Sequence, residues 1–266
     1  MTTPPPRDAG LRHGLILTAG LGTRLRPLTL VRAKPALPVG GEPIIRRIVR
    51  QMTDSGIRDL VLNLHYLPET IAAVVGDGSD LGACIRYSWE HPRVLGSAGG
   101  PRLALDLIDA ETFVIANGDT LTDVDLAALC AHHRDHRAHV TLALTPNHEP
   151  DRYGGVRLAP GGRVLGFVAR GAAARGSHHF LGVQVVNRRV FESVPLREPA
   201  STIGGIYDRL IATCPEAVHG FVSQPSFWDV GTVDTYVATS HAFATDASAE
   251  RGQGAHIAPE IGRAHV

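Results

Sequence analysis

The chain has 266 residues, and its 26 Lys plus Arg are balanced by 26 Asp plus Glu. This balance excludes a strong overall attraction to nucleic acid or to an anionic membrane, so any anion must be recognised locally. The length allows one large α/β domain with a substantial core. No apolar run approaches the roughly 20 residues that span a bilayer, and residues 1–12 lack the apolar segment of a signal peptide. We therefore expect a cytoplasmic protein with neither a membrane nor a nucleic-acid partner.

The cysteines and the lysine are the informative features of the composition. Cys84, Cys130 and Cys214 lack the close paired spacing of a zinc cluster, which indicates small core residues in a reducing compartment. Among the 26 basic residues, Lys34 is the only lysine. A chain that otherwise uses Arg has kept this ammonium, which suggests a site that a planar guanidinium does not fit. Chance survival of a surface lysine would give the same count.

Strands and helices are predicted to alternate through the first half of the chain. The apolar segment His13–Ala19 predicts a buried strand that runs into a Gly-rich loop. The other strands predicted here are Asp59–Leu64, Ala83–Trp89 and Thr112–Ala116, and the helices are Pro43–Ser55, Pro68–Val75, Ala98–Leu107 and Asp123–Asp135. This alternation indicates an α/β fold with a doubly wound, mainly parallel, Rossmann-like sheet. Since ligands bind beyond the carboxyl ends of such strands, the loops that begin at Gly20 and Asn117 should face one cleft.

The second half of the chain is richer in strands and predicts a subdomain that is inserted in or appended to the main sheet. Its predicted strands are Val140–Leu144, Gly155–Leu158, Val164–Val168, Phe180–Val186 and Phe227–Val230, and its predicted helices are Thr202–Thr213 and Thr232–Phe243. We expect one domain over residues 13–245, after a disordered tail at 1–12. Residues 246–266 are either a disordered tail or a vestigial or truncated first coil of a left-handed β-helix, because Ala255–Val266 has apolar or small residues at about six-residue spacing.

The segment Leu17–Leu28 (LTAGLGTRLRPL) carries the strongest functional signal. Gly20 and Gly22 allow backbone N–H groups to face phosphate oxygens, and Arg24 adds a fork of donors suited to a triphosphate. A leucine stands where the dinucleotide fingerprint G-x-G-x-x-G has its third glycine, and the segment is no Walker loop either. A dinucleotide-dependent oxidoreductase is therefore disfavoured.

The pattern G-x-G-T-R-L-x-P-L-T, followed by Lys34 and a proline, resembles the signature of the sugar-1-phosphate nucleotidyltransferase family. This family includes mannose-1-phosphate guanylyltransferases and glucose-1-phosphate thymidylyl- and uridylyltransferases. The resemblance implies a reaction of a nucleoside triphosphate with a sugar 1-phosphate, which gives an NDP-sugar and pyrophosphate. It also places the family's phosphate-contacting lysine at Lys34.

The same resemblance implies a magnesium site. Asn117–Asp119 follows an apolar strand, and Asp119 matches the family's metal aspartate, although N-G-D alone is a common turn. Trp228–Thr232 resembles the family's W-x-D-x-G-T segment and implies Asp229 as the second carboxylate, although here no residue separates the Trp from the Asp. Magnesium is usually held by one or two carboxylates together with phosphates, which fits this pair.

Glu90–Gly100 (EHPRVLGSAGG) resembles the family's E-x-x-x-L-G-T-A-G segment, which closes around the base and the sugar. Ser97 could instead cap the helix that follows. The implied catalytic residues are Arg24, Lys34 and Asp119, and the implied nucleotide-binding residues are Leu17, Ala19, Gly20, Gly22, Thr23, Arg24, Gly96, Ser97, Ala98 and Asn117.

The sugar side departs from the family pattern. Tyr153 and Gly154 resemble its R-Y-G segment, and Arg170 stands where F-V-E-K-P has the lysine that would hold the sugar phosphate. Ala169 replaces the carboxylate of that segment, and Gly182 lies in a replacement for the family's N-A-G. The resemblance implies that the sugar phosphate is bound by Tyr153, Gly154, Arg170 and Gly182. Ala169 cannot supply the carboxylate that would bind sugar hydroxyls.

Sugar identity is therefore weakly constrained. Overall likeness favours GTP with mannose 1-phosphate or a manno-heptose 1-phosphate. The alternatives are a UTP-dependent amino-sugar-1-phosphate uridylyltransferase and a non-catalytic sugar-nucleotide-binding regulatory protein of the same fold. The oligomeric state stays open, with a homodimer among the alternatives.

Histidines gather in two places outside these motifs. His132 and His136 have the i,i+4 spacing that could ligate a metal, but without the Glu of H-E-x-x-H a solvated helix face is the favoured interpretation. His178 and His179 lie close to a sugar-side strand and are better candidates than the first pair for contact with the substrate.

Overall fold

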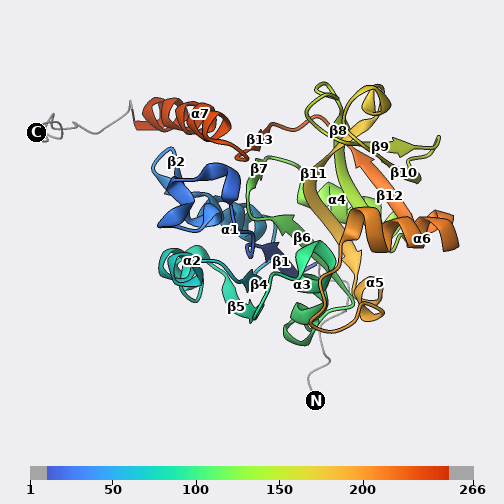
Figure 1. Ribbon diagram of the computed structural model, residues 1–266, viewed down its shortest axis with the longest axis horizontal. Coiled ribbons are helices and arrows are strands. Elements are labelled where there is room, and N and C mark those ends of the chain that lie inside the picture. Colours follow the sequence, from blue (N-terminus) through green and yellow to red (C-terminus); the bar gives the residue numbers. More distant parts are fainter. Residues whose placement is uncertain (1–10, 252–266) are drawn as a thin grey trace, which may run out of the picture.

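The computed structural model describes residues 11–251 and contains a nine-stranded mixed sheet (Figure 1). Four neighbouring strands run parallel in the order β6-β1-β4-β5, with bounds Thr112–Asn117, His13–Leu17, Asp59–Leu64 and Cys84–Trp89. The strand β11 (His178–Asn187) pairs antiparallel with β6 and joins this half to β8 (Val140–Pro146), β9 (Gly155–Leu158), β10 (Val164–Val168) and β12 (Val218–Val222). The sheet is mainly parallel where the Gly-rich loop begins and strand-rich beyond β11, as predicted.

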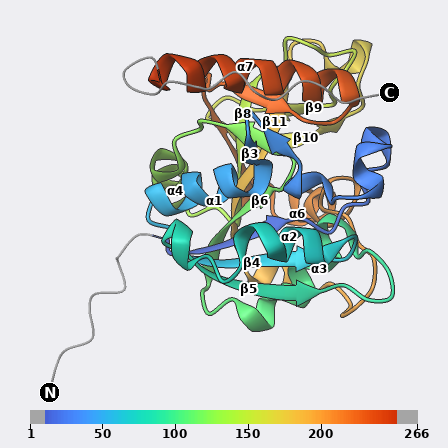
Figure 2. The same ribbon diagram turned by 90° about the vertical axis from the view of Figure 1, so that its left-hand side faces the viewer.

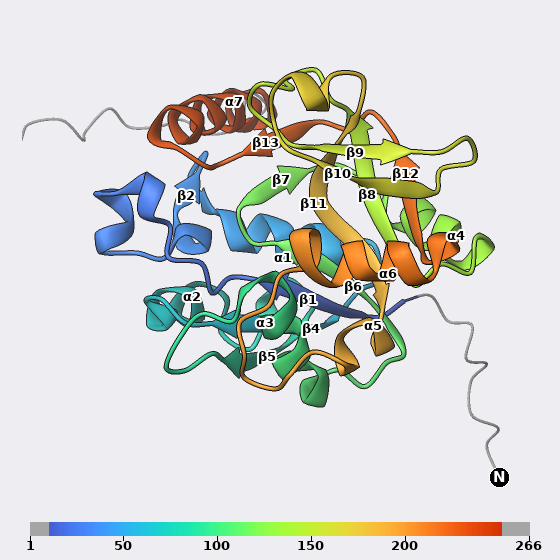
Figure 3. The same ribbon diagram turned by 45° about the vertical axis from the view of Figure 1, so that its right-hand side comes forward.

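Helices cover both faces of the sheet. On one face lie α1 (Ile44–Asp54), α2 (Pro68–Val75) and α4 (Leu126–Asp135), which Figure 2 shows in front. On the other lie α3 (Gly96–Ala104), α5 (Arg189–Glu192) and α6 (Tyr207–Thr213), in front in Figure 3. Each face of the sheet has its own hydrophobic core. In β1 the fully buried Ile16 packs in the core beneath α1, α2 and α4, and its neighbour Leu15, also fully buried, packs in the core beneath α3, α5 and α6. Strands buried on both faces read as continuous apolar runs.

Two short strand pairs stand apart from the main sheet. The strands β2 (Pro38–Val39) and β3 (Glu42–Pro43) lead into α1. The strands β7 (Thr120–Thr122) and β13 (Phe227–Asp229) pair antiparallel with Asp229 opposite Thr120. This second pair brings the two aspartate segments together although more than a hundred residues separate them in the sequence.

The long helix α7 (Val233–Arg251) follows β13 and lies against β2 (Figure 1). The Tyr236 hydroxyl donates to the Pro38 carbonyl oxygen at 2.8 Å. The Phe243 ring lies 4.9 Å from that of Trp228 and under the Arg47 guanidinium. These contacts fix the segment that carries Asp229 to the segment that carries Lys34.

Most predicted elements are present, with some altered bounds. The helix predicted over Asp123–Asp135 begins only at Leu126, because Asp125 is its N-cap and accepts from the Ala128 N–H at 2.9 Å. The helix predicted over Thr202–Thr213 is regular only from Tyr207, since Gly204 has a φ of 74° and breaks its first part. The strands β7 and β12 and the short helix α5 were not predicted.

Both ends of the chain lie partly outside the residues that the structure describes. The helix α7 continues to Arg251, past the predicted domain end at 245. The coil suggested for Ala255–Val266 lies outside the described residues, as do residues 1–10 of the predicted tail. None of the helices in residues 11–251 combines the length and the apolar character that crossing a membrane requires.

Candidate active site

The Gly-rich segment leaves the carboxyl end of β1 and turns at once into a short 3-10 helix, Thr23–Leu25. Gly22 makes this turn with a φ of 61°, and its carbonyl oxygen accepts from the Leu25 N–H at 3.0 Å and from the Thr29 hydroxyl at 2.8 Å. A Cβ at Gly22 would lie 2.9 Å from the Thr29 methyl group. A glycine is therefore required at this position for two reasons: the backbone is left-handed, and the loop packs too closely for a side chain.

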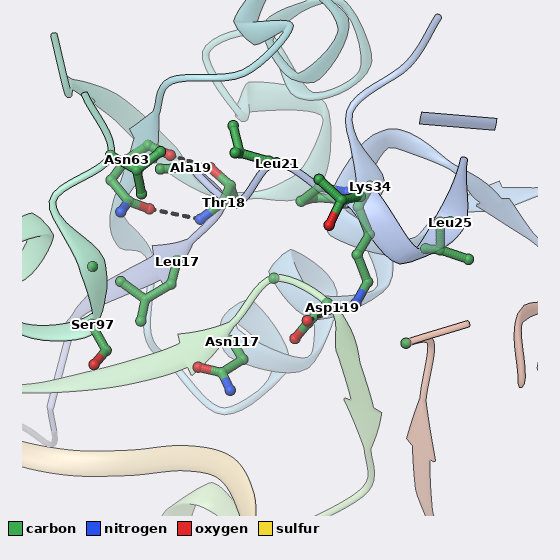
Figure 4. Close-up of a pocket in the computed structure, with 18 of the residues that line it drawn as sticks. Leu17, Thr18, Ala19, Leu21, Leu25, Lys34, Asn63, Ser97, Asn117 and Asp119 are labelled. Atoms are coloured by element: carbon green, nitrogen blue, oxygen red, sulfur yellow. Dashed lines mark hydrogen bonds and ion pairs between the residues drawn. The ribbon is translucent and has the colours of Figure 1, made fainter. Parts of the chain in front are cut away.

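Beside this loop, Lys34 and Asp119 form an ion pair. The Lys34 ammonium donates to Asp119 Oδ2 at 2.7 Å, with the Lys34 side chain 9% and the Asp119 side chain 37% exposed (Figure 4). The aspartate is placed by Gly118, whose N–H donates to the Leu17 carbonyl oxygen at 2.9 Å. The stem of the lysine is thus buried, and its charge faces the open side of the aspartate.

These residues surround a cavity of about 440 Å³ that is open to solvent (Figure 4). It is lined from β1, the Gly-rich loop, the start of α3 and the end of β6. Eleven of the twelve residues that the sequence assigned to catalysis or nucleotide binding lie in its wall: Leu17, Ala19, Gly20, Gly22, Thr23, Arg24, Lys34, Gly96, Ser97, Asn117 and Asp119. The structure thus brings together segments that lie about a hundred residues apart in the sequence.

Asp229 lies next to this wall. The Val230 N–H donates to the Asp119 carbonyl oxygen at 3.3 Å, and Gly231 lines the cavity. A Cβ on Gly231 would lie 2.9 Å from Asp229 Oδ2, which places that carboxylate at the cavity rim. Two carboxylates beside an open cavity are the hard oxygen donors that Mg²⁺ takes, so these residues fit the implied ion.

A buried polar brace in the cavity wall was not anticipated. The Thr18 N–H donates to Asn63 Oδ1 at 2.6 Å, the Asn63 amide donates to Glu90 Oε1 at 2.7 Å, and Glu90 Oε2 accepts from the Leu95 N–H at 2.6 Å. All three polar residues are at most 3% exposed. The brace ties the Gly-rich loop to the loop before α3. Its signal in the sequence is the single polar residue near the end of the apolar strand DLVLNL.

Two residues in the first turn of α3 differ from expectation. Ser97 lies within α3 rather than capping it, and its Oγ accepts from the Thr202 N–H at 2.9 Å. Ala98 is fully buried behind the cavity wall, and its N–H already donates to the Ala200 carbonyl oxygen at 2.9 Å. The backbone donor expected to read the nucleobase from Ala98 is therefore engaged within the protein.

Among the predicted sugar-side residues, Gly154 lines a smaller cavity of about 220 Å³, together with His179 and Phe180. The rings of Tyr153 and His179 pack in a tilted arrangement with centroids 4.1 Å apart, and the Arg152 guanidinium lies over Tyr153 at 4.7 Å. Burial, with the Asp229 charge as a second cause, raises the pKa of Tyr153 to about 12. The phenol is therefore neutral and able to donate a hydrogen bond.

The other two sugar-side predictions have different surroundings. Arg170 is exposed and lies in the wall of neither cavity, just after β10 and near Gly154. Gly182 has a φ of 75°, and a Cβ there would lie 2.7 Å from the Asn117 amide nitrogen. Gly182 thus lies where the pairing of β11 with β8 shifts register, beside Asn117 in the wall of the larger cavity.

Replacing Gly182 by alanine should therefore disturb Asn117 as well as strain the backbone. We expect a loss of about 1–3 kcal/mol in the free energy of unfolding and a raised KM. Gly176→Ala is a matched control, because Gly176 has a φ of 70° but open space around its Cβ position. Denaturant titration of both variants separates strain from contact, and equal losses would remove the role given to the Asn117 contact.

His179 gives the second prediction from this region. Burial lowers its pKa from 6.5 to about 4, against a smaller opposing effect of a hydrogen bond with the Gly154 backbone. As the pH falls, His179 therefore takes up a proton in the unfolded chain before it does so in the folded protein. The free energy of unfolding should decrease by on the order of 2 kcal/mol as the pH drops from 6.5 to 4.

In His179→Phe the ring can still pack against Tyr153 but cannot titrate. This variant should therefore lose less stability than the parent chain over the same pH range. His148→Gln, at an exposed histidine, should behave as the parent chain does. Urea denaturation at pH 6.5, 5.5 and 4.5 measures the difference, and parallel curves for the parent and His179→Phe would refute the assignment.

Comparison with known proteins agrees with this geometry. The family model for nucleotidyl transferases matches residues 13–246. The chain is 34% identical over 227 residues to a mannose-1-phosphate guanylyltransferase of Mycobacterium tuberculosis. The aligned region covers 85% of this chain and 63% of that protein. It is 33% identical to a D-glycero-alpha-D-manno-heptose 1-phosphate guanylyltransferase of Aneurinibacillus thermoaerophilus, over 84% of this chain and 95% of that one. An N-acetylmuramate alpha-1-phosphate uridylyltransferase of Neisseria meningitidis is 35% identical over 68% of this chain and 77% of its own length.

Solved structures show the same fold. A putative glucose-1-phosphate thymidylyltransferase from Bacillus anthracis superposes with a TM-score of 0.77 at 19% identity, over 87% of this chain and 95% of that one. HddC from Yersinia pseudotuberculosis gives 0.74 at 22% identity, over 88% of this chain and all of that one. The chain spans about three fifths of the length of the mannose-1-phosphate guanylyltransferases it matches, at 63% and 60% for two of them. On the match to residues 13–246, this chain belongs to the nucleotidyl transferase family.

Proposed function

We propose that this chain joins a nucleoside triphosphate to a sugar 1-phosphate, giving an NDP-sugar and pyrophosphate. The observation that carries the proposal is the pairing of the sole lysine with Asp119 at 2.7 Å in the wall of a cavity framed by the Gly-rich loop. The buried ammonium of Lys34 and the exposed guanidinium of Arg24 belong to residues that line the same cavity, and together they suit a ligand with several phosphate charges. The complete loop and both aspartates favour turnover over a purely regulatory role.

In this reaction an oxygen of the sugar phosphate attacks the α-phosphorus in line, and pyrophosphate leaves. The nucleophile is already an anion, so no general base is needed. Catalysis then depends on orientation and on neutralising charge, with Arg24 and Lys34 on the triphosphate. The brace from Thr18 to Glu90 would hold the loop in place from within the cavity wall.

Asp119 and Asp229 are the residues that would hold Mg²⁺. When bound, the ion would neutralise phosphate charge during the transfer. Lys34 holds Asp119 by one oxygen, Oδ2, while Oδ1 has a longer contact with the Thr120 hydroxyl at 3.3 Å. The lysine thus orients the carboxylate and leaves its other oxygen less firmly engaged.

On the sugar side, we assign Tyr153, Gly154 and Gly182 to the sugar phosphate. We assign Arg170, which follows β10 next to Gly154, to the sugar phosphate as well. The relatives named for mannose and manno-heptose phosphates favour GTP with one of these two sugar phosphates. UTP with an amino-sugar 1-phosphate is the second candidate, because the Neisseria meningitidis relative is a uridylyltransferase. Since the reaction consumes a nucleoside triphosphate, we place it in the cytoplasm.

A pyrophosphate-release assay tests this function. The four nucleoside triphosphates are combined in Mg²⁺ with mannose, manno-heptose, glucose and N-acetylmuramate 1-phosphates. We expect release only with both substrates present, and most of it with GTP. Thermal shifts with each triphosphate alone report binding, since ligand linkage raises the melting temperature only for binders. A melting shift without pyrophosphate from any pair would support the regulatory alternative and overturn the enzymatic one.

A further inference from the structure

Three histidines from two elements meet outside the cavities described above. His132 lies in the last turn of α4, His136 is the C-cap residue of that helix, and His219 lies on β12, the strand at the edge of the sheet beyond β8. The helix α4 and the strand β12 contact each other, and Figures 1 and 3 show them side by side. None of the three residues lines the cavity beside Lys34. The i,i+4 pair that looked like a solvated helix face therefore has a partner from another element.

The rings are close enough to share one ion. The centroids of His132 and His136 are 4.0 Å apart in a stacked pair, and those of His136 and His219 are 4.7 Å apart. One ligand nitrogen from each of the three residues lies within 4.8 Å of the other two. A tetrahedral ion with bonds of about 2.0–2.1 Å holds its nitrogens about 3.4 Å apart. Small side-chain rotations are enough to close that difference.

Two of these nitrogens are buried without a hydrogen-bond partner. They are Nε2 of His132 and Nδ1 of His219, and the His219 side chain is only 8% exposed. Leaving a buried polar atom unpaired typically costs about 1–3 kcal/mol. On His136, Nδ1 is 3.0 Å from the His132 carbonyl oxygen, which leaves Nε2 for another partner. An ion between the rings would satisfy both of the unpaired nitrogens.

The surroundings resemble the outer shell of a metal centre. Metal-binding histidines usually direct their second ring nitrogen at a carbonyl or carboxylate oxygen. For His136 this is the His132 carbonyl oxygen, and His219 Nε2 lies 3.9 Å from Glu216 Oε2. The Phe221 ring, 5.5 Å from that of His132, covers one side of the cluster.

We propose that His132, His136 and His219 form a binding site for a transition-metal dication, with Zn²⁺ as the best fit. Three imidazoles suit the borderline-soft ions, whereas Mg²⁺ and Ca²⁺ require oxygen ligands. The exposed side at His136 leaves a fourth position for water. Such an ion would join the end of α4 to β12 and would be independent of the proposed transfer reaction.

The charge state of the cluster agrees with this assignment. Burial and then the neighbouring histidines lower the pKa of His132, and burial followed by His136 lowers that of His219. Asp135 and Glu216 oppose these shifts, and Arg163 adds to that of His219. Both rings are therefore neutral near pH 7, as metal ligands must be.

The test is metal binding by the full chain carrying Asp119→Asn, which weakens the proposed magnesium site. After treatment with a chelator, the protein is titrated with Zn²⁺ against a chromophoric chelator, and separately with Co²⁺, whose visible absorption reports tetrahedral nitrogen coordination. We expect one Zn²⁺ per chain, an intense Co²⁺ spectrum and a higher melting temperature with Zn²⁺. Adding His136→Gln, at an exposed ring, should weaken Zn²⁺ binding at least about 100-fold and abolish the Co²⁺ spectrum.

His219→Asn should have the same effect, while His148→Gln, away from the cluster, should leave binding unchanged. Circular dichroism of each variant without metal shows whether the fold is retained. Absence of stoichiometric Zn²⁺ binding, or unchanged affinity in a folded His136→Gln variant, would overturn the site. Pyrophosphate release is measured separately, so failure of the metal site and failure of the proposed reaction are distinguished.

Discussion

Replacing Asp119 by asparagine should lower the rate of pyrophosphate release at least about 10²-fold, or about 3 kcal/mol in the barrier, while the fold remains intact. The asparagine keeps the shape and one oxygen that can accept from Lys34, so only the negative charge is removed. That charge is what an oxygen-ligated dication requires beside a triphosphate. Because the Asp119 side chain is 37% exposed, its pairing with Lys34 contributes about 1 kcal/mol or less to stability.

Asp123→Asn is the matched control for this variant. Asp123 lies four residues further along the chain and outside the active-site cavity, and its Oδ1 accepts from the Ser226 N–H, which an asparagine oxygen can also do. Both variants are assayed with Mg²⁺ at saturating substrates and melted in parallel. Residual release above about a tenth of the parent rate in Asp119→Asn would contradict the metal assignment.

The sequence was sufficient to predict the parallel half of the fold. The segments Asp59–Leu64 and Pro68–Val75 have the predicted bounds, because an apolar run between turn residues and a helix with Pro in its first turn are local signals. The strand Val218–Val222 was missed, since its sequence VHGFV contains a glycine and a histidine and it is defined by pairing with β8. Pairing of this kind depends on residues far away in the chain.

The same distinction applies to the site. The Gly-rich loop and Lys34 could be assigned from a contiguous motif. The pairing of Lys34 with Asp119, by contrast, spans 85 residues and depends on where β6 ends beside β1. Ala98 shows the limit of the motif, because its N–H is engaged by Ala200, a residue that no local pattern connects to it. The histidine cluster shows the same limit, since His219 enters it from a strand that was not predicted.

Lys34→Met should lower the catalytic rate by a similar factor of about 10² and weaken triphosphate binding. Methionine retains much of the buried stem but removes the ammonium, so the cavity keeps its shape and loses a charge. The position is closely packed, with the Lys34 side chain 9% exposed and its Cβ 3.3 Å from a Cβ placed on Gly22. A variant that melts near the parent temperature but releases little pyrophosphate would be the expected result.

Lys34→Arg then tests why this chain keeps one lysine. Arginine restores the positive charge, but its planar fork is wider than an ammonium and needs several acceptors in one plane. At this packed position, where Asp119 Oδ2 is the acceptor, we expect the fork to displace the aspartate and activity to stay below about a tenth of the parent rate. The measurement is kcat and KM for the triphosphate in all three proteins. If arginine restored parent activity, charge alone would explain the site, and the lone lysine would have no functional meaning.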